Sequence, residues 1–123
     1  MFEYPTYKLV HFLGLFIVFT ALAGRAYYAL NGGTKDADVA RKLTGAAHGT
    51  GLLLVLVGGF GMLAKSGMIH SLPGWVHAKL TLWLLVAAAL ALPFRSPGLA
   101  RALLIALPLL GLAGAWLAGA KPF

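Results

Sequence analysis

The sequence predicts an all-α protein, an integral membrane up-down four-helix bundle that forms one transmembrane domain over residues 1–123. Of the 123 residues, 60% are hydrophobic and only 11% are charged, whereas soluble domains carry about a quarter charged residues. The mean hydropathy is +0.86. Four apolar runs each approach the roughly 20 residues that a helix needs to cross a bilayer. A soluble enzyme is therefore excluded.

Turn residues, prolines and basic side chains separate the four predicted spans. The spans are 8–30, 43–64, 74–94 and 99–120. Connections this short place neighbouring helices antiparallel. Both termini and the 65–73 loop then lie on one side of the membrane, which we call side A, and the 31–42 and 95–98 loops lie on the other, which we call side B. The glycines of the fourth span indicate a packing wall.

The basic side chains predict how the bundle sits in the membrane. Ten Lys and Arg residues against three acids give a net charge of +7. These cations are scattered between apolar runs instead of clustering on one face, which argues against nucleic acid as a partner and makes the lipid bilayer the expected one. More of them flank side B, so the positive-inside rule places the 31–42 and 95–98 loops in the cytoplasm of a multi-pass protein in a bacterial-type inner (plasma) membrane.

Few side chains within the spans can carry chemistry. The chain has no Cys, which excludes disulfides, iron–sulfur clusters and c-type haem attachment. No Asp or Glu lies in any span, which argues against a cation-coupled transporter. The ionisable residues of the spans are His11, Arg25, His48, His77 and Lys79.

Helix rise predicts which of these residues share a depth in the membrane. His11 and His77 both lie near the side A ends of their helices, and His48 should lie about 15 to 20 Å away from them. Two imidazoles at one depth predict the axial ligands of a b-type haem, with His11 and His77 bound to the iron. Gly14 and Gly51 leave room beside the first two histidines for a flat macrocycle.

Anionic propionates of such a haem would prefer the polar end of the site, where Lys8 lies one turn before His11. At side B, Arg25, Tyr27, Tyr28 and His48 form a second candidate pocket. It suits a quinone, an anionic lipid headgroup or a second haem on His48. The alternative for Arg25, as for Lys79, is a long side chain that reaches out to the aqueous interface.

Two short segments resemble known families of small membrane proteins. Residues 74–80 (GWVHAKL) are similar to the third span of HemJ-type protoporphyrinogen oxidases, and residues 8–11 (KLVH) resemble the start of that family and of the SirB family. SirB-like chains also have a histidine at the place of His48. The resemblance implies haem b or a porphyrin as ligand, with His11 and Lys79 carried over from the HemJ pattern. The chain is shorter than typical HemJ proteins.

Three hypotheses for function follow. The first is a small membrane b-type cytochrome that transfers electrons to or from a quinone or a neighbouring redox subunit, because two axial imidazoles leave no open iron position. The second is an enzyme that oxidises a porphyrinogen, as the HemJ resemblance implies. The third is a cofactor-free subunit that stabilises a larger membrane complex, or a homo-oligomer, through its glycine-lined faces.

Overall fold

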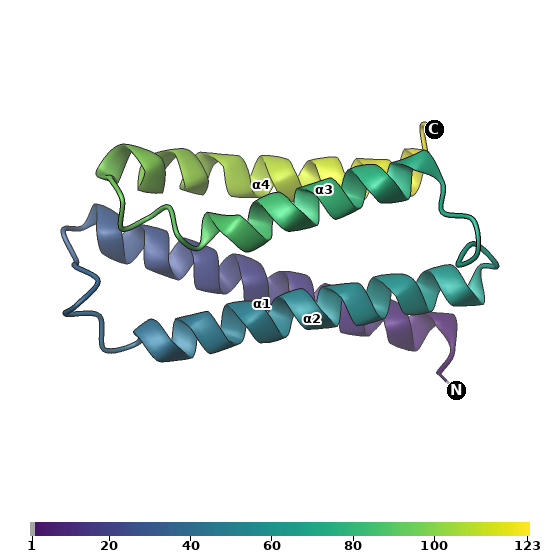
Figure 1. The fold of residues 1–123 in the computed structure, drawn as a ribbon, viewed down its shortest axis with the longest axis horizontal. Helices are drawn as coiled ribbons and strands as arrows, with labels where there is room; N and C mark the ends of the chain where they lie inside the picture. Colours follow the sequence, from purple (N-terminus) through teal and green to yellow (C-terminus); the bar gives the residue numbers. More distant parts are fainter. Residues whose placement is uncertain (1) are drawn as a thin grey trace.

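The computed structural model describes residues 2–123, and these form four antiparallel α-helices with no strand among them. The helices are α1 (Tyr4–Leu30), α2 (Arg41–Lys65), α3 (Gly74–Ala89) and α4 (Pro97–Ala120). They run up and down in sequence order, with both termini and the 66–73 connection at side A (Figure 1). The predicted all-helical fold with four alternating helices is confirmed.

Three of the helices, α1, α2 and α4, are long and apolar enough to cross a membrane. With 27, 25 and 24 residues, each exceeds the roughly 20 residues that a span requires. Large apolar side chains such as Leu13, Ile105 and Leu112 are exposed along them, which suits a hydrocarbon surrounding. The chain is a membrane protein on this evidence.

Local sequence signals explain the helix ends. Pro5 and Pro97 lie in the first turns of α1 and α4, where a missing backbone N–H costs nothing. The Ser96 side chain caps α4 by accepting a hydrogen bond of 3.1 Å from the Leu99 N–H. Gly32 and Gly67, at φ +92° and +75°, end α1 and α2 in the left-handed conformation that glycine adopts most readily.

The third helix is shorter than the predicted span 74–94. It contains 16 residues and ends at Ala89, so at a rise of 1.5 Å per residue it covers about 24 Å of a hydrocarbon core of about 30 Å. Pro93 contributes to the difference, because it has no N–H to bond the Ala89 carbonyl four residues earlier and its ring would clash with that carbonyl in a continuous helix. Residues 90–95 instead form tight turns, with hydrogen bonds such as that from the Leu92 N–H to the Ala89 carbonyl at 3.0 Å.

The closest helix contact joins α1 to α2, and glycines make it. A Cβ atom on Gly14 would lie 2.6 Å from the Gly51 carbonyl oxygen, and one on Gly58 would lie 2.6 Å from the Tyr7 carbonyl oxygen. Both distances are far below ordinary van der Waals contact, so only glycine fits at these positions. Backbone-to-backbone packing therefore fixes α1 against α2.

The packed apolar core lies toward side B, between α1, α3 and α4. Its fully buried centre includes Val18, Leu22 and Ala26 of α1, against Val86 of α3 and Leu103 of α4. A smaller cluster joins Leu63, Trp75, Val76 and Leu117 near side A. Between these two clusters the side A half of the bundle is hollow.

Candidate functional site

Two adjoining chambers occupy the side A half of the bundle. The larger has a volume of about 620 Å³ and is lined mainly by α1 and α4. The smaller, of about 210 Å³, is lined mainly by α2 and α3. Seven residues line both chambers: Tyr4, His11, Val55, Met62, Lys79, Trp83 and Ala118.

His11 is the buried polar residue at the junction of the chambers. Its side chain is 7% exposed, and its Nδ1–H donates a hydrogen bond of 2.9 Å to the Val55 carbonyl of α2. A carbonyl only accepts, so this contact fixes the proton on Nδ1 and leaves Nε2 with its lone pair. An imidazole oriented in this way by a backbone carbonyl is suited to bind a metal through its free nitrogen.

Lys79 is the half-buried cation between the chambers. Within residues 2–123 it has no hydrogen-bond or ion-pair partner, and no acidic side chain lines either chamber. Lys8 also lines the larger chamber, with its ammonium 5.8 Å from the Phe12 ring centre. Lys121 lines the smaller one but donates to the Ala118 carbonyl at 2.6 Å. Both chambers are therefore apolar with a positive potential.

His77 does not share the chambers with His11. It is exposed on α3 and lines neither chamber, whereas Lys79, two residues later, lines both. Residues two apart on a helix differ by about 200° in direction. His77 therefore lies on the face of α3 that points away from the chambers, and the chambers are lined instead by His11 and Lys79.

His48 lies away from the chambers, in the contact between α2 and α3. It is 3% exposed, and its Nε2–H donates to the Val86 carbonyl at 3.2 Å. It precedes Gly58, which packs on His11, by ten residues, or about 15 Å of helix rise. Trp83 makes a comparable bond, from its indole Nε1–H to the Leu52 carbonyl at 3.1 Å. Both bonds tie α3 to α2.

Arg25 joins three segments at side B. Its guanidinium donates to the Leu90 carbonyl at the end of α3 (3.4 Å) and to the Arg41 carbonyl in α2 (3.1 Å), and it lies 5.4 Å from the Phe94 ring centre. Carbonyls at a helix C-terminus carry partial negative charge, which favours a cation there. Its Nε is buried without a partner. The long side chain therefore turns inward to bind backbone.

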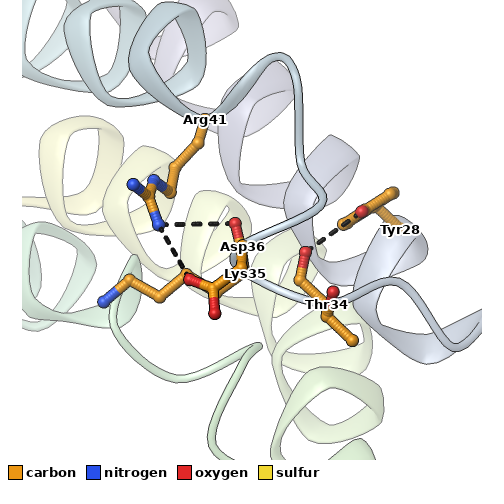
Figure 2. Close-up of polar contacts among 5 residues, drawn as sticks. All are labelled: Tyr28, Thr34, Lys35, Asp36 and Arg41. Carbon is orange, nitrogen blue, oxygen red and sulfur yellow. Dashed lines mark hydrogen bonds and ion pairs between the residues drawn. The ribbon is translucent and has the colours of Figure 1, made fainter.

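The other residues of the predicted side B pocket have separate contacts. Tyr27 is exposed, and the Tyr28 hydroxyl donates to the Thr34 carbonyl at 3.1 Å (Figure 2). Figure 2 also shows the Arg41 guanidinium against the Lys35 carbonyl (3.4 Å) and the Asp36 carboxylate (3.8 Å). These contacts hold the 31–40 loop against the helix ends.

The structure gives the glycines different roles from those predicted. Gly14 and Gly51 face each other in the α1–α2 contact, so the space beside them is filled by helix backbone and holds no macrocycle. The α4 glycines predicted as packing, Gly111 and Gly114, line the larger chamber, and Gly111 also packs against the Phe19 ring of α1. Trp83 lines both chambers.

No protein-family model, curated protein or solved structure matches the chain.

Proposed function

We propose that this protein is a small membrane b-type haem protein that binds haem in the larger chamber with His11 as an axial ligand, and that it transfers electrons within the membrane. All four helices then lie in the bilayer, with the loops of side B in the cytoplasm. The observation that carries the proposal is the buried His11, oriented by the Val55 carbonyl with a free ring nitrogen at a chamber of about 620 Å³.

The chamber suits a large flat ligand. Its volume lies within the roughly 300 to 1,000 Å³ of small-molecule and cofactor sites. Its walls are aromatic on α1, with Phe12, Phe16 and Phe19, and small on α4, where Gly111 and Gly114 keep the backbone close. The Phe19 ring packs against Gly111, and the other aromatic rings of the chamber offer faces on which a planar ring can stack.

The charges of the chamber suit an anionic ligand better than a bare metal ion. Lys8 and Lys79 line it, and no acid among residues 2–123 does. In a membrane, an unpaired cation costs several kcal/mol, so a carboxylate that reaches Lys8, which lines this chamber only, is favourable. Haem b is a flat apolar ring with two propionates, which matches both the walls and the cations.

This chain's residues would bind and orient the group and exclude water from it. Haem supplies one-electron chemistry when bound. His11 would hold the iron through Nε2, since Nδ1 is bonded to the Val55 carbonyl, and that hydrogen bond raises the basicity of Nε2. His77 lines neither chamber and would not hold the group, whereas Met62 lines the larger chamber.

The visible spectrum of the purified protein, oxidised and reduced, tests the proposal. We expect a b-type spectrum that is lost in His11→Ala and kept in His77→Ala and His48→Ala, since only His11 of these three lines the larger chamber. The two control variants remove the same side chain from the same membrane protein. A preparation that stays colourless after addition of haemin would contradict the proposal and favour a cofactor-free subunit. Loss of haem in His77→Ala with retention in His11→Ala would contradict the assignment of His11.

One observation favours a second candidate, an enzyme that oxidises a porphyrinogen. His11 and Lys79, the two residues implied by the HemJ resemblance, line the same chamber. Incubation of the haem-loaded protein with protoporphyrinogen tests it, and porphyrin fluorescence that rises faster with wild type than with Lys79→Met supports the enzyme. Equal rates with both proteins would exclude it.

A further inference from the structure

We propose that the smaller chamber, between α2 and α3, is a binding site for the ring of a membrane quinone, held by the Lys79 ammonium. This deepens the proposed function, and rests on it, by naming the redox partner of the haem protein. The sequence placed a candidate quinone pocket at side B, near Arg25. The structure gives Arg25 backbone partners there and places an unpartnered cation at a chamber on side A.

The size and walls of the smaller chamber select a single planar ring. Its volume of about 210 Å³ is below the roughly 300 Å³ at which drug-sized sites begin, so haem does not fit in it. Aromatic side chains from both helices line it, with Phe60 on α2 and Trp75 and Trp83 on α3. Aromatic walls favour a flat conjugated ring over a flexible acyl chain because offset stacking adds to apolar burial.

Lys79 and the hydroxyl groups of the smaller chamber offer hydrogen-bond donors to a ligand. Lys79 has no partner within residues 2–123, and the hydroxyl groups of Tyr4 and Ser66 also line the chamber. Three other polar side chains of the chamber wall are engaged, since Lys121 donates to Ala118, the Trp83 indole donates to Leu52, and the His11 Nδ1–H donates to Val55. The Trp75 indole also lines the chamber. A quinone carbonyl oxygen is an acceptor that Lys79 can bind without a second buried charge.

The position of the chamber suits a ligand that arrives from the membrane. Of the sequence neighbours, α2 and α3 pack least closely, so an isoprenoid tail can pass between them into the hydrocarbon. His11, Lys79 and Trp83 line both chambers, which puts a ring in the smaller one in direct contact with the haem site. A quinol bound there would give its two electrons one at a time to the group held by His11, with a partner electron acceptor taking each electron in turn, and would release its two protons to the water at side A and leave as the quinone.

Tryptophan fluorescence of the full chain in lipid nanodiscs tests the site, because a quinone quenches nearby indoles and Trp75 and Trp83 form the chamber wall. The probe is a short-tailed ubiquinone analogue. We expect saturable quenching, with a Kd raised about tenfold or more in Lys79→Met, the range for a lost hydrogen bond to a charged group. Lys65→Met is the matched control, since Lys65 lies on the same side of the membrane, is exposed and lines neither chamber. Leu80→Phe, which fills the smaller chamber only, should weaken quenching while the haem spectrum stays unchanged.

Quenching that does not saturate, or an unchanged Kd in Lys79→Met, would overturn the inference. A fatty acid that displaces the quinone and binds more tightly would also overturn it, because the chamber would then be an anion site. The haem spectrum of each sample separates this inference from the proposed function. A red protein that binds no quinone overturns the quinone site alone. A colourless protein with saturable, Lys79-dependent quenching keeps the quinone site and contradicts the haem.

Discussion

Replacement of Gly58 by Ala places a methyl group against the backbone of α1. In the structure a Cβ atom at this position would lie 2.6 Å from the Tyr7 carbonyl oxygen and 2.7 Å from the Cα of His11. Carbon atoms in favourable contact lie about 3.5 Å or more apart, so α1 and α2 must separate locally by about 0.8 Å. Neither neighbour can rotate away because both contacts are with backbone.

The expected loss of stability is about 1 to 3 kcal/mol, the usual cost of added volume in a packed interface. Gly49→Ala is the matched control on the same helix, because Gly49 is exposed and a Cβ atom there meets nothing within 4 Å. That variant should gain up to about 1 kcal/mol from the helix propensity of alanine. The strain in Gly58→Ala also acts on His11, whose backbone is the closest neighbour, so haem affinity should fall with stability.

Thermal unfolding in detergent, followed by circular dichroism, measures the stability, and absorbance after haemin titration measures the affinity. We expect a lower Tm and a higher haemin Kd for Gly58→Ala than for Gly49→Ala. If the two variants unfold at the same temperature, the close α1–α2 contact does not exist in the membrane protein. If stability falls but the haemin Kd does not change, His11 is not the residue that holds the haem.

The same assays test three side chains that donate to backbone carbonyls. Arg25→Gln should lose about 1 to 3 kcal/mol of stability, as expected for hydrogen bonds from a charged group, and an unchanged Tm would show that Arg25 reaches the interface instead. His48→Ala should lower the Tm through the lost Val86 bond and the space left by the ring, with the haem spectrum retained. Trp83→Phe should cost about 0.5 to 1.5 kcal/mol for the lost bond to Leu52, and a Tm equal to that of wild type would contradict that bond.

Apolar length and turn residues were enough to predict the helix count and the up-down order. Helix ends followed where the signal was strong, as at the Asn31-Gly32 and Ser66-Gly67 turns. The end of α3 was missed because the residues after Ala89 are as apolar as those before it, and hydropathy does not record that Pro93 cannot bond the Ala89 carbonyl. The amino-acid composition shows that a segment is apolar, but it does not show whether the backbone of that segment is helical.

The glycines show a second limit of the sequence. Small residues mark places where a neighbouring group comes close. At Gly58 that group is the backbone of α1, at Gly61 it is the Tyr7 ring, and at Gly111 it is the Phe19 ring beside the larger chamber. The two patterns are alike in the sequence, with Gly58 and Gly61 in one helix and Gly111 and Gly114 in the other. What differs is the partner opposite, which depends on how all four helices pack.

The sequence gives the height of each candidate site residue along the membrane normal, but it does not give the direction in which the residue points from its helix. Counting residues from a helix start gives height along the membrane normal, and by that measure His77 is a partner for His11. Direction around the helix axis changes by about 100° per residue, so it depends on which face of α3 turns inward. Trp75, Val76, Lys79 and Trp83 mark that face. The sequence pairs His11 with His77, whereas the residues that line the chambers are His11 and Lys79. The expected chemistry of the site changes accordingly, from two neutral imidazole ligands to one imidazole beside a cation.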